Sequence, residues 1–190
     1  MAVVGVPRGW RSPANAVTGD AAGGWQHPGE RMLDTVRRVR VERFVEAPIE
    51  AVFDWLADPQ HLTSAPLALR VKLVRGGDME RFGVGAIREV TTVGAWFREQ
   101  ITRFEPPTQI HYSIVRSYPR IVHRGGTITL TEAPGGTRAI WVSEYAVSRA
   151  WGGRMTASLL QPALSWSFGR ILEAASEAAS QVPARMIVSK

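Results

Sequence analysis

The hydrophobic residues of the segment 39–59 change their spacing partway along the chain. Valines in residues 39–45 fall on alternate positions, which is the period of a strand with one buried face. Apolar residues in 49–56 then recur every three or four positions, which is the period of a helix packed along one side. Pro48 suits the first turn of such a helix, and Pro59 suits its end. The segment therefore predicts a strand that leads directly into a short helix.

The chain after this unit predicts a series of antiparallel strands joined by turns that are rich in glycine and proline. A leading strand is expected at 35–45, and further strands are expected at 69–74, 85–93, 95–104, 109–116, 121–131 and 137–147. Gly94 predicts a tight hairpin, and the pair Gly125-Gly126 predicts a bulge that redirects the side chains before it. Together these segments predict a sheet of seven strands.

The last third of the chain has a helical pattern. Apolar residues recur at steps of three and four through residues 153–182, which predicts one long helix with a kink at Pro162. Residues 1–34 are rich in glycine and proline and lack periodicity, so we expect a disordered extension there. We expect one domain over residues 35–184, followed by a short tail at 185–190.

Composition narrows the classes of function. The formal net charge is +6 at pH 7, but the arginines are scattered among acidic residues, so nucleic acid is not the expected partner. The chain has no cysteine, which excludes disulfides, thiolate metal sites and cysteine nucleophiles. No apolar run has the length of a membrane span, and the N-terminus lacks the pattern of a signal peptide. We therefore expect a cytoplasmic protein, with peripheral membrane contact as an alternative that the positive charge leaves open.

Three short motifs resemble those of a known superfamily. Residues 47–53 (APIEAVF) followed by Asp58 resemble the opening signature of the START-like, or SRPBCC, superfamily, which includes polyketide cyclases and Bet v 1-type proteins. Residues 104–112 resemble its strand–turn–strand segment, and residues 135–138 resemble its last hairpin. The resemblance implies an α+β helix-grip fold, in which a curved antiparallel seven-stranded sheet wraps around a long C-terminal helix. It also implies a hydrophobic cavity between the sheet and that helix.

Alternation along two strands brings charged residues to the face that carries the apolar residues. Glu99 shares this face with Phe97 and Ile101, and Arg116 shares it with Tyr112 and Ile114. Because isolated buried charges are costly, Glu99 and Arg116 are expected to pair or to meet a polar group of a ligand. In the catalytic interpretation Glu99 is a general base, Arg116 polarises a carbonyl and Tyr112 donates a proton. In the alternative interpretation the charged residues form a structural ion pair at the cavity rim.

Further side chains are candidates for contact with a ligand, although core packing is the alternative for each of them. The full set is Phe97, Ile101, Tyr112, Ile114, His123, Trp141, Tyr145, Met155, Leu159 and Trp166. His123 is preferred to His111 because the predicted bulge turns it inward. The sequence has no metal-ligand spacing, no phosphate-binding glycine loop and no nucleophile elbow, so we expect no metal and no cofactor.

The leading hypothesis for function is the binding of a hydrophobic small molecule, such as a lipid, a polyketide or an isoprenoid. A polyketide cyclase or dehydratase on the same fold is the first alternative, because one scaffold hosts both functions. A ribosome- or membrane-associated interaction module is the second alternative. The sequence predicts no oligomeric state.

Overall fold

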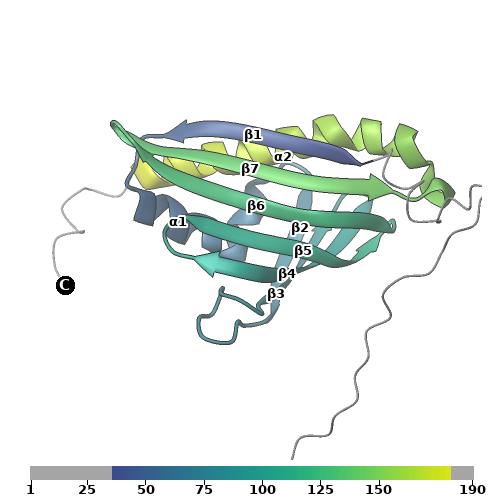
Figure 1. Ribbon diagram of the computed structural model, residues 1–190, viewed down its shortest axis with the longest axis horizontal. Helices are drawn as coiled ribbons and strands as arrows, with labels where there is room; N and C mark the ends of the chain where they lie inside the picture. Colours follow the sequence, from purple (N-terminus) through teal and green to yellow (C-terminus); the bar gives the residue numbers. More distant parts are fainter. Residues whose placement is uncertain (1–35, 181–190) are drawn as a thin grey trace, which may run out of the picture.

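Seven antiparallel strands and one long helix dominate the computed structural model, which describes residues 36–180 (Figure 1). The predicted extension at 1–34 and the predicted tail at 185–190 lie outside these residues. The elements are β1 (Arg37–Val45), α1 (Ile49–Ala57), η2 (Pro59–Ser64), β2 (Ala68–Arg75), β3 (Ile87–Thr92), β4 (Ala95–Glu105), β5 (Gln109–Tyr118), β6 (Ile121–Ala133), β7 (Gly136–Val147), η3 (Arg149–Trp151) and α2 (Gly153–Ser180).

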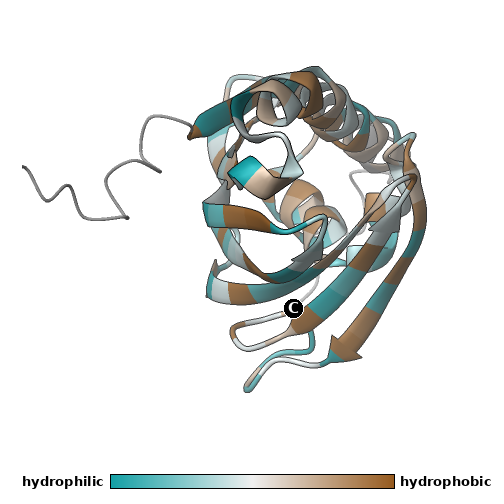
Figure 2. Ribbon diagram, turned by 90° about the vertical axis from the view of Figure 1, so that its right-hand side faces the viewer, coloured by the Kyte–Doolittle hydropathy of each residue, from teal (hydrophilic) through white to brown (hydrophobic). Residues whose placement is uncertain are grey.

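The strands form a single sheet in the order β1-β7-β6-β5-β4-β3-β2. Strands β2 to β7 follow one another as hairpins, and β1 pairs with β7 at one edge. The sheet curves around α2, and α1 lies on the same concave side (Figures 1 and 2). The predicted α+β helix-grip fold is therefore confirmed.

The core forms where the apolar faces of these elements meet. The valines of β1 and the apolar stripe of α1 are buried, as the change of period predicts. On α2, Ile171, Leu172 and Ala175 are buried in the same cluster. Thr137 of β7 donates a buried hydrogen bond of 2.8 Å to the carbonyl of Ala47, which fixes the start of α1 against the sheet. Burying each large apolar side chain stabilises the fold by roughly 1.5–3 kcal/mol.

The register of the hairpins places three chain connections at one end of the sheet. Trp96 pairs with Tyr118, so the β3–β4 turn lies beside the end of β5. Ile121 pairs with Val147, so the β5–β6 turn lies beside the end of β7, and α2 begins shortly after it. The β2–β3 connection lies at the opposite end, because Arg75 pairs with Ile87 there.

One strand departs from the predicted alternation. Alternation within residues 69–74 places Leu69, Val71 and Leu73 on one face, but the register of β2 shifts between Ala68 and Arg70. Val71 is buried, whereas Leu69 is 66% exposed. A bulge changes the face on which the residues before it lie, and alternation in the sequence does not reveal it.

Candidate ligand-binding site

A cavity of about 230 Å³ lies between the sheet and α2. Its lining comes from η2, from the start of β2 and the connection before it, from strands β3 to β7 and from one face of α2, and most of these side chains are apolar. On α2 the lining residues recur at steps of three and four: Thr156, Leu160, Ala163, Leu164, Ser167, Phe168 and Ile171. Small residues alternate with large ones along this face, so the helix covers the cavity without filling it.

The cavity opens at the end of the sheet where the hairpin turns gather. Val93 and Gly94 of the β3–β4 turn line it, as do Pro119 of the β5–β6 turn and Thr156 of the first turns of α2. Val93 is also 64% exposed, so this residue lies at the boundary between cavity and solvent. We call this end of the molecule the mouth end.

Glu99 lies in the cavity wall, as predicted, but its partner is Arg88 and not Arg116. Arg88 on β3 pairs directly with Glu99 on β4, and its Nε–H donates to Oε2 of Glu99 at 2.7 Å. Both side chains are buried, at 4% and 11% exposure. Burial of the pair is tolerated because each charge meets the other.

The predicted inward position of Arg116 is wrong. Arg116 is exposed and lies opposite Arg98 in the β4–β5 ladder, outside the cavity lining. The register of this ladder shifts between Arg98 and Glu99, so Ile114 and Arg116 no longer share a face. Arg88 was not among the predicted site residues. Ala86 and Val90 lie two positions before and after it, so alternation places Arg88 on the same apolar face.

The guanidinium of Arg88 has N–H groups that donate no hydrogen bond to any of the described residues. Its Nε–H bonds Glu99, and within residues 36–180 no protein acceptor takes a hydrogen bond from its two terminal nitrogens. The group also lies 5.3 Å from the centroid of the Tyr112 ring, which is cation–π distance. Arg88 can therefore offer N–H groups to a polar atom that enters the cavity.

Tyr112 lies in the wall between Arg88 and the aromatic side chains of β7 and α2. Its hydroxyl oxygen accepts a hydrogen bond of 3.0 Å from Nε1 of Trp141, whose ring stacks on Phe168 at 4.2 Å. A Cβ on Gly126 would lie 2.1 Å from the Tyr112 ring, so glycine is required for this close approach. Burial raises the pKa of Tyr112 to about 12, so the hydroxyl keeps its proton at neutral pH.

His123 is turned into the cavity, and the predicted bulge is the reason. Gly125 has φ of 131°, and the register of β6 against β7 shifts between His123 and Gly125. The Ile114 N–H donates to Nδ1 of His123 at 3.0 Å, so the neutral ring carries its proton on Nε2. Nε2 then donates to the hydroxyl of Ser143 at 3.1 Å. Burial lowers the pKa of His123, and the negative charge of Glu99 opposes this effect.

The remaining candidates divide between the cavity and other surroundings. Phe97, Ile114, Trp141 and Tyr145 line the cavity. Tyr145 donates its hydroxyl to the carbonyl of Ala157 at 2.8 Å, and burial raises its pKa to about 12. Ile101 is buried at 3% exposure but belongs to the core outside the cavity lining.

The three candidates on the helix side point away from the cavity. Met155, Leu159 and Trp166 are 73%, 71% and 54% exposed, so their predicted positions in the lining are wrong. They occupy a different face of α2 from the one that begins with Thr156 and Leu160. Within the helical pattern of residues 153–182, one apolar stripe runs through Leu160, Leu164 and Phe168, and extending this stripe back to the start of α2 excludes all three candidates.

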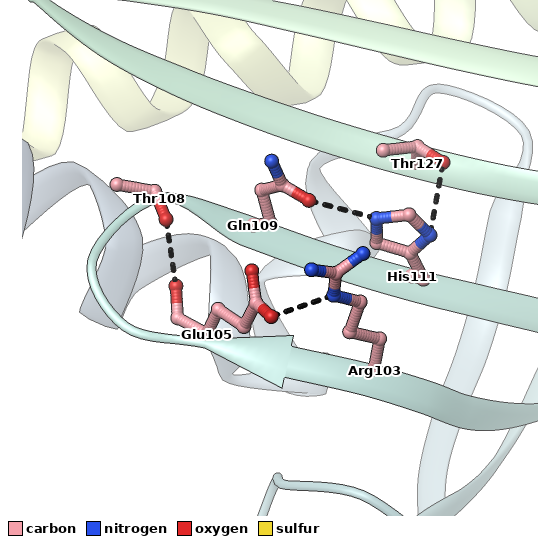
Figure 3. A network of polar contacts seen from close by, with 6 residues as sticks. All are labelled: Arg103, Glu105, Thr108, Gln109, His111 and Thr127. Carbon is pink, nitrogen blue, oxygen red and sulfur yellow. Dashed lines mark hydrogen bonds and ion pairs between the residues drawn. The ribbon is translucent and has the colours of Figure 1, made fainter.

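The outer face of the sheet carries a separate polar network (Figure 3). His111 lies between Gln109, at 3.0 Å, and Thr127, at 3.5 Å, while Arg103 pairs with Glu105 at 2.6 Å. His111 therefore faces outward, as alternation predicts. Among the described residues, no group of three or more histidine or acidic side chains could hold a metal ion. No helix in this part of the chain is long and apolar enough to cross a membrane.

Comparisons agree with the fold. The sequence profile of the family described as "Polyketide cyclase / dehydrase and lipid transport" matches residues 36–179, which confirms the resemblance seen in the motifs. No curated protein sequence matches the chain.

Several solved structures share the architecture. The di-domain ARO/CYC BexL from the BE-7585A biosynthetic pathway aligns with a TM-score of 0.65 at 19% identity, over 81% of this chain and 54% of that one. A START superfamily protein from Mycobacterium smegmatis aligns with a TM-score of 0.61 at 14% identity, over 74% and 97% of the two chains. The structure of Ara h 8.0201 aligns with a TM-score of 0.55 at 17% identity, over 74% of this chain and 97% of that one. At these identities the likeness shows the fold alone.

Proposed function

The chain belongs to the polyketide cyclase / dehydrase and lipid transport family, and we propose that it binds a hydrophobic small molecule in the cavity between its sheet and α2. The observation that carries this proposal is the cavity itself, with its apolar lining and its opening at the mouth end. Protein interiors are ordinarily packed without voids of this size. A concave apolar space with a few polar groups is the usual form of a small-molecule site.

The polar groups in the wall suggest which end of a guest they would meet. Arg88 has N–H groups that meet no acceptor among the described residues, and Tyr112 keeps its hydroxyl proton at neutral pH. A guest with an apolar body and one acceptor oxygen would suit both properties. Lipids, polyketides and isoprenoids that carry a carbonyl or hydroxyl oxygen all belong to this class.

The geometry favours binding over a cyclase or dehydratase reaction. Glu99 is held by Arg88, and both ring nitrogens of His123 are engaged with Ile114 and Ser143. A general base needs a lone pair that is free to reach a substrate proton. Catalysis at Glu99 would therefore have to compete with its ion pair.

The test is to identify what the protein carries when it is purified from its own host. Native mass spectrometry of the full chain should show an apolar guest at one per chain. Ala163→Phe puts a large ring into the cavity lining and should lose that guest, whereas Ala174→Phe, on α2 but outside the lining, should keep it. A protein without a guest, or one that retains it in Ala163→Phe, would contradict the proposal. Conversion of an added poly-β-ketone to a cyclised product would favour the enzymatic alternative.

A further inference from the structure

Large apolar side chains gather on the surface of the mouth end. Their exposures are 64% for Val93, 62% for Tyr118, 41% for Trp151, 73% for Met155 and 71% for Leu159. Single exposed apolar residues are normal on a protein surface, but a cluster of them marks an interaction site.

Three separate segments bring these side chains to the same end. Val93 lies in the β3–β4 turn, and Tyr118 ends β5 beside that turn. Trp151 belongs to η3, which precedes α2, and its ring meets that of Tyr118 edge-on at 5.3 Å. Figure 2 turns this end toward the viewer and shows α2 lying across the open side of the curved sheet. Folding thus builds the cluster, and no short stretch of sequence contains it.

The same end carries positive charge that has no carboxylate partner within residues 36–180. Arg116, Arg120, Arg149 and Arg154 are exposed, and none of them forms an ion pair with a described residue. Elsewhere in residues 36–180, eight arginine–carboxylate pairs are present.

Acidic residues are sparse in the segments that build this end. In the segment 106–172 they are Glu132, in the hairpin at the opposite end, and Glu144, which pairs with Arg38. We use the name mouth surface for the five apolar residues and the four arginines.

We propose that the mouth surface docks on an acidic lipid membrane. Arginines near an anionic bilayer are each attracted to its surface, and salt screens this attraction. Tryptophan and tyrosine favour the headgroup level, where an apolar ring and a polar tip are both satisfied. Met155 and Leu159 lie one helical turn apart at the start of α2 and can enter the same layer together.

The aliphatic residues favour a membrane over a nucleic acid or a ribosome. Arginines and aromatic rings would suit phosphates and bases, but exposed methionine, leucine and valine have no stacking surface to offer them. Burial in a bilayer is energetically favourable for all five apolar side chains. Docking in this orientation would place the cavity opening against the lipid, so an apolar guest could pass without crossing water.

Vesicle binding tests this inference directly and needs no guest in the cavity. The full chain should pellet with vesicles of phosphatidylcholine and phosphatidylglycerol, pellet little with phosphatidylcholine alone, and lose binding as salt is raised. Arg149→Glu with Arg154→Glu should reduce the partition coefficient by about tenfold or more. Met155→Asp with Leu159→Asp should have an effect of the same size, because it removes the inserted apolar area and adds repulsion.

Matched controls lie at the opposite end of the molecule. Met79 is 97% exposed and Arg81 is exposed in the β2–β3 connection, so Met79→Asp and Arg81→Glu should leave binding unchanged. The proposal would be overturned if the control variants lost as much vesicle binding as the mouth-surface variants. It would also be overturned if the wild type failed to bind acidic vesicles. Salt-sensitive binding to ribosomes that depends on the arginines but not on Met155 and Leu159 would also overturn it. Any of these results would leave the cavity proposal untouched, since guest binding is measured without lipid.

Discussion

The Arg88–Glu99 ion pair stabilises the polar part of the cavity wall. A buried ion pair is stable only while both partners are present, because either charge alone is left in a medium of low polarity. We therefore expect Glu99→Ala to lower the free energy of unfolding by about 3–5 kcal/mol. Replacing both residues, with Arg88→Met and Glu99→Leu, should recover most of this loss. Denaturant unfolding of the purified variants measures both effects.

The exposed pair Arg103–Glu105 provides the matched control for this experiment. Its side chains are 55% and 43% exposed, so Glu105→Ala should cost less than about 1 kcal/mol. If Glu99→Ala were as stable as the wild type, the carboxylate would be held in the cavity without a stabilising partner. That outcome would support a catalytic acid or base at this position.

At the scale of elements, the contact between β5 and β6 depends on side chains. Backbone pairing of the two strands covers Gln109 to Tyr112 against Gly126 to Thr129. Beyond it, His123 accepts the N–H of Ile114, and the hydroxyl of Ser117 accepts the N–H of Ile121 at 3.0 Å. The imidazole thus takes the place of a carbonyl in the ladder, which is possible only while Nδ1 carries no proton.

This arrangement predicts a pH dependence of stability. The pKa of His123 in the folded protein lies below its usual value, so the unfolded chain binds the proton more readily. The stabilisation from His123 should be fully present above about pH 6.5 and should be lost as the pH falls below that value. His123→Asn keeps an acceptor for Ile114 but does not titrate. The stability difference between wild type and this variant should therefore shrink from about pH 7.5 to about pH 5.5; an unchanged difference would contradict the account.

Most elements could be predicted from the sequence because periodicity is a local property. The change of hydrophobic period at Pro48 predicted β1 and α1, and the helical spacing of apolar residues in 153–182 predicted α2. The side of the sheet on which a side chain lies was predicted correctly where the strand is regular, as for Glu99 and Tyr112. It was predicted wrongly beyond a register shift, as for Arg116 and Leu69. The bulge at Gly125-Gly126 was predictable because glycine marks it, whereas no glycine marks the shift before Arg116.

At the scale of the whole molecule, the cavity was expected only from the family resemblance, and the mouth surface could not be predicted from periodicity at all. The Arg88–Glu99 pair depends on which residues face each other across β3 and β4, and the mouth surface depends on three segments meeting at one end. Both are products of register and curvature. The exposed positions of Met155 and Leu159 gained a proposed role only after the structure placed them at the same end as Trp151 and the arginines of the mouth surface.

The binding of a neutral fluorescent guest tests the central claim most directly. N-phenyl-1-naphthylamine should bind the wild type at one per chain with a blue-shifted emission, and it should raise the melting temperature as its concentration increases. Ala163→Phe, which fills the cavity, should abolish both effects, while Ala174→Phe should retain them. Binding that is unchanged in Ala163→Phe, or no binding to the wild type, would show that the space between the sheet and α2 does not receive a guest.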